Sequence, residues 1–410
     1  MQMTFVSITL LAILFTIPTI FFRYKIGLNP FWDTDVYVRA IKALRTGLDP
    51  YYFDDSIQIY SAYPYHPYVL GFMVTLDKLI FFQFWLTLGY TISLSFFIRE
   101  LFLTYGGLEI ENSENFPKAK FVIFLIIAGM IGGSSVIGLA SGNISIFLHF
   151  TLLALSLRSI RLNKSFGSLA AVSIASAIVK PYFLTYLLIA LVYSKSKRRG
   201  MMICFSSILA WSFIYFSATV LNSQMFDHYL AAVRYVTSGI QDWGYSFFGI
   251  LRRRLGDEFA LLVHLAILSS SVAFPLYLRF VRNYTPTQMA SFFPSICYFI
   301  VCLNPRMKEY DFGVLVFVSI SSLYLLNRKL AYFSLFVCSI LLLFRQLLLW
   351  LDANLIDYFP SNVLYLKYWE VVMVGLLVIL STTINYSTYT LKSHKLLTYF
   401  KNLRSTKDFS

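Results

Sequence analysis

Twelve runs of predominantly apolar residues recur along the chain and are separated by short polar segments. A helix needs about 20 apolar residues to cross the hydrocarbon core of a bilayer. The pattern therefore predicts an all-α polytopic membrane protein with about twelve transmembrane helices. The runs lie at 3–22, 80–103, 121–139, 144–160, 167–179, 182–194, 200–221, 258–280, 287–303, 309–326, 331–350 and 368–389.

Basic residues between the runs orient these helices, because lysine and arginine collect in cytoplasmic loops. The segments 158–164, 195–199 and 328–329 and the tail 391–410 are basic. With these four on the cytoplasmic side, both termini are cytoplasmic, and residues 1–410 form a single integral-membrane domain. The loops then expected outside are 23–79, 140–143, 180–181, 222–257, 304–308 and 351–367.

The first outer loop, 23–79, contains two stretches with a helical pattern. Between residues 35 and 47 four apolar residues fall on one face and three cations fall away from it: Val36, Ala40, Ala43 and Leu44, against Arg39, Lys42 and Arg45. This predicts an amphipathic helix on the membrane surface, ended by Gly47. The second stretch, 68–79, is apolar but short, so we expect an interfacial or re-entrant helix.

The segment 167–194 must hold two passes in 28 residues. At 1.5 Å per residue each pass is about 20 Å long, shorter than the roughly 30 Å hydrocarbon core. We therefore expect a short hairpin with Lys180 and Pro181 at its tip. Because irregular backbone at membrane depth must be buried in protein or line water, the tip is expected inside a cavity.

Composition supports the membrane class and narrows the partners. The chain is 58% hydrophobic and only 13% charged, whereas soluble domains carry about 25% charged residues. A net charge of +14 would suggest nucleic acid in a soluble protein. Here cytoplasmic loops and anionic headgroups account for it, so membrane lipids are expected partners and nucleic acid is not. The four cysteines lie in or beside apolar runs without metal-ligand spacing, which indicates buried thiols.

The outer loop 23–79 is the expected catalytic loop because it combines carboxylates with a polar setting. Asp33 and Asp35 open the predicted amphipathic helix, where aspartate commonly caps a helix. Alternatively, one of them is a general base facing a cavity, since residues two apart point in different directions on a helix. A metal site at residues 33–35 is a further alternative. His66 is either a packed or capping residue or a group near substrate.

Later polar segments supply further candidates. Asn143 lies in a turn between two spans and could bond a polar substrate. Lys180 is costly at membrane depth unless paired, and phosphate is a natural partner. Arg252 belongs to a run of three arginines that is expected on the outer side, although arginine and lysine usually collect in cytoplasmic loops. In the segment 304–311, Arg306 and Lys308 could clamp a phosphate while Glu309 and Asp311 orient them.

In their order, these motifs resemble those of glycosyltransferase family 87. That family comprises membrane mannosyltransferases of the GT-C fold that use polyprenyl-phosphate-mannose. The resemblance spans about residues 30–315 and rests on the order and spacing of the motifs rather than on any single one. The residues are Asp33, Val36, Tyr37, Ala40, Ala43, Leu44, Gly47, Asp49, Pro50, Tyr51, Tyr63, Pro64, Gly142, Asn143, Lys180, Pro181, Pro305, Arg306, Tyr310 and Asp311. The chain departs where Asn143 replaces the more usual glutamine and where Tyr65 and His66 interrupt Y-P-P.

The resemblance implies an inverting transfer of a sugar, most often mannose, from a polyprenyl-phosphate donor to a hydroxyl of a glycolipid or surface glycan. It implies Asp33 as the general base, with Asp35 as second choice. Donor phosphate would meet Lys180, Arg306, Lys308 and Arg252, and the substrate-binding residues would be Tyr37, His66, Asn143, Tyr310 and Asp311. No cofactor is implied, and family habit places the active site on the periplasmic face of a bacterial inner membrane.

Two rival classes stay open at this point. A glycan ligase or polymerase also uses outer-face Arg and His, but it relies on a large later loop, whereas the carboxylate-rich loop comes first here. A transporter or flippase of a lipid-linked saccharide would show repeated halves and charges at mid-span. We find no internal repeat, and the polar residues cluster at the outer ends of the spans.

Overall fold

The protein is described by a computed structural model, in which the residues described are 32–51, 65–79, 82–105, 142–164, 166–238, 247–285, 289, 292–302, 314–315, 318–320, 323–324, 329–334, 336–337, 375–384 and 387. Nearly all of these residues are helical and none of them lies in a β-strand. The predicted all-α class is therefore confirmed for this part of the chain.

Three helices of the described chain are long and apolar enough to cross a membrane. They are α7 (Ile144–Leu162), α10 (Lys197–Leu221) and α13 (Asp257–Leu276), which continues through the π-helical turn η4 (Tyr277–Val281). Each coincides with one of the predicted apolar runs. The length and composition of these helices indicate membrane association.

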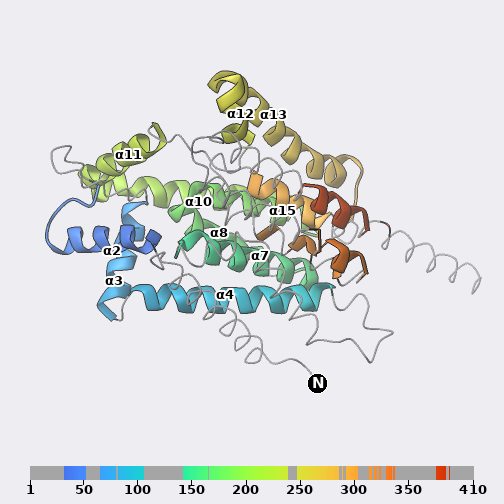
Figure 1. Ribbon diagram of the computed structural model, residues 1–410, viewed down its shortest axis with the longest axis horizontal. Helices are drawn as coiled ribbons and strands as arrows, with labels where there is room; N and C mark the ends of the chain where they lie inside the picture. The colour runs from blue at the N-terminus through green and yellow to red at the C-terminus, as the bar shows by residue number, and fades with distance from the viewer. Residues whose placement is uncertain are drawn as a thin grey trace, which may run out of the picture.

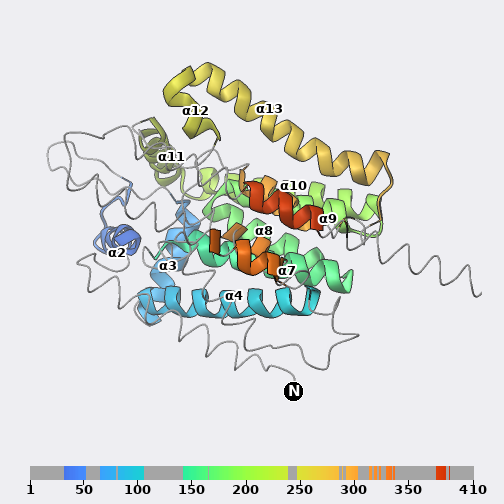
Figure 2. The ribbon, with the colours of Figure 1, turned by 45° about the vertical axis from the view of Figure 1, so that its right-hand side comes forward.

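These helices belong to a bundle whose members pack in sequence order. α4 (Phe82–Tyr105), which coincides with the run 80–103, packs on α7, α7 packs on α8 (Phe166–Val179), and α8 packs on α10. The axes of α4, α7 and α10 follow nearly the same direction in both views (Figures 1 and 2). Phe97, Phe150 and Phe183 are fully buried between them, and α15 (Phe293–Cys302) adds Phe293 to the same core.

The predicted short hairpin is present. α8 has 14 residues and is followed by the 3₁₀ helix η3 (Pro181–Tyr186) and by α9 (Leu187–Tyr193). At the standard rises each arm is about 20–23 Å long. Lys180 joins the two arms, and its extended backbone starts η3 with Pro181 at the first position. Pro fits there because the first helical residues have no intrahelical acceptor for their N–H groups.

Two helices of the first loop lie across one end of the bundle. α3 (Pro67–Leu79) runs across the direction of α4 in both views, and α2 (Trp32–Arg45) is seen along its axis in Figure 2 while α4 is seen from the side. α11 (Ser223–Ser238) lies at the same end, and α12 (Phe247–Leu255) packs against α13. This crossing arrangement agrees with the predicted amphipathic and interfacial helices.

The predicted helix of residues 35–47 is confirmed, with a different buried face. α2 begins at Trp32, and its buried apolar residues are Tyr37, Ala40 and Ile41, while Val36 is half-buried. Thr34 is also buried. The helix is rotated because the large Tyr37 side chain occupies the interior. The three predicted cations are exposed, and the helix ends as expected. Gly47 is left-handed, with φ 75°, and the N–H of Leu48 donates to the carbonyl of Ala43 at 2.9 Å, the bond of a Schellman motif.

The two described basic turns lie together at the opposite end of the bundle. α8 and the arm formed by η3 and α9 reverse the chain twice, so the end of α7 and the start of α10 meet at one end (Figure 1). Glu100 is fully buried there and accepts from Arg161 at 2.6 Å and from Arg99 at 2.9 Å. This ion pair ties α4 to α7, and removing one partner would leave a buried charge uncompensated.

The close contact of α9 and α10 depends on Gly200. A Cβ atom at this position would lie 2.9 Å from the carbonyl oxygen of Ala190 and 3.1 Å from the Leu191 Cα. We expect Gly200→Ala to lower the free energy of unfolding by roughly 1–3 kcal/mol, because backbone must move. The midpoint of thermal unfolding of the purified chain in detergent measures the effect.

Gly71→Ala is the matched control, since a Cβ atom at Gly71 in α3 meets nothing within 4 Å. It should stabilise by about 0.5–1 kcal/mol through helix propensity alone. Equal midpoints for the two variants would contradict the steric role of Gly200.

Candidate functional site

Residues from three separate polar motifs meet around the hydroxyl of Tyr37. The Tyr37 hydroxyl lies 3.1 Å from the Tyr65 hydroxyl and accepts the N–H of Ile144 at 3.4 Å. The hydroxyl of Tyr51 donates to the carbonyl of Tyr65 at 2.7 Å. Because Ile144 is the first residue of α7, its N–H has no acceptor within the helix. Tyr37 therefore docks α2 directly onto the start of α7.

Asn143 caps α7. Its side-chain oxygen accepts the N–H of Ser145 at 2.9 Å, and Asn143 itself is buried. Gly142 before it has φ 70°, a left-handed conformation that favours glycine. The turn that the sequence predicted is thus present. A contact between Asn143 and a substrate stays a prediction.

His66 is fully buried in an aromatic cage and bonds main-chain groups through both ring nitrogens. Its Nε2 lies 3.1 Å from the carbonyl of Tyr215, and its Nδ1 accepts the N–H of Tyr68 at 3.3 Å. The rings of Tyr215, Phe226 and Tyr229 lie 4.7–5.7 Å from the imidazole. Desolvation lowers the pKa of His66, and the bond to Tyr215 opposes this more weakly. The packed and capping role that the sequence left open is the one seen in this structure.

Lys180 is brought to the same end of the bundle as Asn143, because α7 and α8 run antiparallel. Its neighbours Ile178 and Val179 pack in the same apolar cluster as Tyr37 and Ile144. Lys180 itself is half-buried. The start of α7, Lys180 and α2 therefore lie in one region. The sequence pattern presented them as separate candidates.

The two candidate bases occupy different positions on α2. Asp35 is exposed. Asp33 stands four residues before Tyr37, and residues four apart share one face of a helix. The assignment of Asp33 as the general base stays a prediction.

The remaining predicted residues are elsewhere. Arg252 lies in α12, where its Nε is 2.5 Å from Asp257 Oδ1 at the start of α13. Residues Arg306, Lys308, Tyr310 and Asp311 lie outside the described residues. Among the residues that the structure describes, no group of three or more His, Cys, Asp or Glu is arranged to hold a metal ion.

α11 clamps the first loop onto α10, a role that the sequence pattern did not predict. His228 pairs with Asp49, whose other oxygen accepts the N–H of Tyr51 at 2.8 Å. The hydroxyl of Tyr229 lies 2.9 Å from that of Tyr215 in α10. Apolar residues at helical spacing, Phe226, Tyr229, Leu230 and Val233, indicate this amphipathic helix in the sequence.

His149 is a second residue without an assigned role. It is fully buried within α7, with its Nδ1 2.7 Å from the Tyr186 hydroxyl and its Nε2 2.9 Å from the Tyr182 hydroxyl. Both tyrosines belong to η3, so His149 fixes the segment that follows Lys180. An ionisable residue inside an apolar run is the sequence feature that singles it out.

The chain was compared with protein-family models, with curated proteins and with solved structures. None of the three comparisons finds a match.

Removal of the Tyr37 hydroxyl should loosen α2. We expect Tyr37→Phe to cost about 1–3 kcal/mol of unfolding free energy, because the buried N–H of Ile144 loses its acceptor. Tyr68→Phe is the matched control, because Tyr68 is only half-buried and its partner Ser217 also donates to the carbonyl of Ile214. Thermal unfolding in detergent should rank Tyr37→Phe clearly below Tyr68→Phe, and the reverse ranking would contradict the docking role.

Acid should weaken the cage around His66. Because its pKa is lowered from the ordinary 6.5 in the folded protein, the neutral ring's stabilisation is complete above that value and is lost as the pH falls below it. The unfolding midpoint of the wild type should therefore fall more between about pH 7.5 and about pH 5 than that of His66→Gln. An equal fall in both proteins would show that His66 does not contribute to the acid sensitivity.

Proposed function

We propose that the protein is an inverting glycosyltransferase that moves a sugar, most commonly mannose, from a polyprenyl-phosphate donor to a hydroxyl of a glycolipid or surface glycan. One observation carries the proposal. The Tyr37 hydroxyl docks the helix that bears Asp33 and Asp35 on the start of α7, at the bundle end where Asn143 and Lys180 lie. A carboxylate-bearing helix and a lysine at one end of the bundle support this proposal.

Asp33 is the proposed general base. As the acceptor oxygen attacks the anomeric carbon, its proton passes to the carboxylate, and the bond from that carbon to the phosphate oxygen breaks. The polyprenyl phosphate leaves with the bonding electron pair. Attack opposite the leaving group inverts the anomeric centre. The family resemblance favours Asp33, with Asp35, which is exposed, as second choice.

Lys180 is the proposed contact of the donor phosphate. A phosphate ester is a good leaving group, so the protein mainly needs fixed positive charge near it. Lys180 follows a helix that packs beside Tyr37 and Ile144, and His149 fixes the segment after it. Arg306 and Lys308 are proposed to complete the phosphate site. Arg252 is a weaker candidate because Asp257 already engages its guanidinium.

The proposed architecture has about twelve transmembrane helices, as the apolar runs indicate, and the GT-C fold that the family resemblance implies. We assign the end that carries α2 and α3 to the outer face because both described basic turns lie at the opposite end, and basic loops are cytoplasmic. By family habit this is the periplasmic face of a bacterial inner membrane. No cofactor or metal takes part in the proposed scheme.

The decisive test is sugar transfer by the purified chain in lipid, with polyprenyl-phosphate-mannose as donor. We expect Asp33→Asn to lower the transfer rate by about 10²–10⁴-fold, the usual contribution of a general base. Asp35→Asn is the matched control and should retain most of the activity, and both variants should keep the wild-type unfolding midpoint.

Each other outcome has a distinct meaning. Loss of activity in Asp35→Asn alone would keep the transferase and move the base by two residues. If the wild type released no polyprenyl phosphate from any sugar donor, the transferase would be excluded. A transporter or flippase of a lipid-linked saccharide would then be the leading alternative.

A further inference from the structure

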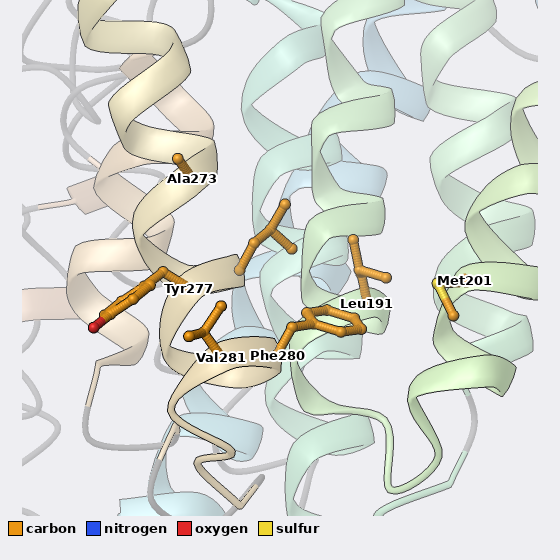
Figure 3. A pocket seen from close by; sticks show the side chains of 7 residues that line it. Leu191, Met201, Ala273, Tyr277, Phe280 and Val281 are labelled. Atoms are coloured by element: carbon orange, nitrogen blue, oxygen red, sulfur yellow. The ribbon is translucent and has the colours of Figure 1, made fainter.

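A groove lies between α13 and the neighbouring α9 and α10, at the basic end of the bundle (Figure 3). It has a volume of about 520 Å³. Leu191 of α9 and Met201 of α10 line it on one side, and Ala273, Tyr277 and Phe280 line it from α13 and η4 (Figure 3). Leu276 and Val281 complete the lining. The groove is far from Tyr37 along the bundle, because α2 lies at the opposite end (Figure 2).

The lining of the groove suits a hydrocarbon chain. Its side chains are apolar, and both α10 and α13 are long and apolar enough to cross a membrane. The groove opens onto the surface of the protein, near the end of the segment 257–281, which is long and apolar enough to span a membrane. The solvent at such a position is lipid, so an acyl chain is the ligand that this surface meets.

Cations gather on both sides of the groove's basic end. Arg198 and Arg199 stand just before Met201 in α10, Arg282 follows Val281 in η4, and all three are exposed. Lys197 links the two sides, because its Nζ donates to Asn283 Oδ1 at 2.6 Å and lies 5.3 Å from the ring of Phe280. Lys197 thus connects the start of α10, which carries Arg198 and Arg199, to the end of η4, which Arg282 follows.

The backbone that carries these cations is held in place by Arg279, and the cations have no acidic partner among the described residues. Arg279 is buried and donates to the carbonyls of Ser194 at 2.8 Å and Tyr284 at 2.8 Å, which holds η4 against the end of α9. The ion pairs of the described chain involve none of Arg198, Arg199 and Arg282. Uncompensated cations beside an apolar groove match one ligand class, a lipid with a negatively charged head.

We propose that this groove binds an anionic phospholipid of the leaflet at the basic end. One acyl chain lies between Leu191, Met201 and Ala273, and the phosphate lies against Arg198, Arg199 and Arg282. A neutral phospholipid would leave these cations uncompensated, and free inorganic phosphate would leave the groove unfilled. The proposal is independent of sugar transfer, because it concerns the other end of the molecule.

Retention of lipid by the purified full chain tests the proposal. The chain is exchanged into neutral detergent with equal amounts of phosphatidylglycerol and phosphatidylcholine of the same chain length, and bound lipid is counted by native mass spectrometry. The wild type should retain phosphatidylglycerol over phosphatidylcholine by about tenfold or more, because each cation near an anionic headgroup contributes severalfold. Added salt should reduce this preference.

Two pairs of variants test the binding of the acyl chain and the binding of the headgroup separately. Ala273→Trp fills the groove and should abolish retention, whereas Ala266→Trp, two turns earlier on the same exposed face of α13, should retain lipid. Replacing Arg198 and Arg199 by Gln should abolish the headgroup preference. The control removes two exposed cations of α2, Arg39→Gln with Lys42→Gln, and should preserve it.

Several results would overturn the proposal. Equal retention of the two lipids by the wild type would exclude recognition of the anionic head. Wild-type retention by Ala273→Trp would exclude the groove, and displacement of the lipid by millimolar inorganic phosphate would identify a free anion as the ligand. If Ala273→Trp fails to fold, Met201→Trp on the opposite wall applies the same test.

Discussion

The hydrogen bond between the Tyr37 hydroxyl and the N–H of Ile144 fixes the position of α2. An isolated helix of 14 residues is marginally stable in water, so its place depends on what it packs against. The start of α7 offers a buried donor with no acceptor of its own, and leaving it unpaired would cost about 1–3 kcal/mol. Tyr37 meets that need and shares its hydroxyl with Tyr65. The carboxylates of α2 are consequently held relative to the bundle rather than to the loop alone.

Around this bond, several buried polar side chains bond one another or the main chain. Tyr51, His66 and Tyr229 each bond a named partner, and their rings fill the space between α2, α3, α10 and α11. A hydrogen-bonded network of this kind resists displacement, because moving one member leaves a buried polar group unpaired. Burial also raises the pKa of the Tyr51 and Tyr229 hydroxyls, so both stay protonated. Such a frame suits a site that must hold a base in a constant position.

The two ends of the bundle differ in chemistry. One end carries the crossing helices, the aromatic network and Lys180, while the other carries the basic turns and the buried Glu100 with Arg161. This separation follows from the antiparallel order of α7, α8 and α10, since each reversal returns the chain to one of the two ends. A proposed transfer site and a proposed lipid groove at opposite ends can therefore act on different leaflets without competing for the same surface.

The sequence alone determined the features that depend on local spacing. Apolar periodicity predicted α7, α10 and α13, the shortness of 167–194 predicted the hairpin, and Gly47 predicted the end of α2. Tertiary structure decided the features that depend on contacts between distant residues. The rotation of α2 toward Tyr37, the cage around His66 and the clamp of α11 each rest on partners about 100 or more positions away in the chain. The same holds for the meeting of Asn143 and Lys180, because only chain reversal brings them to one end. Local pattern specifies which helices form, whereas buried hydrogen bonding specifies how they face one another.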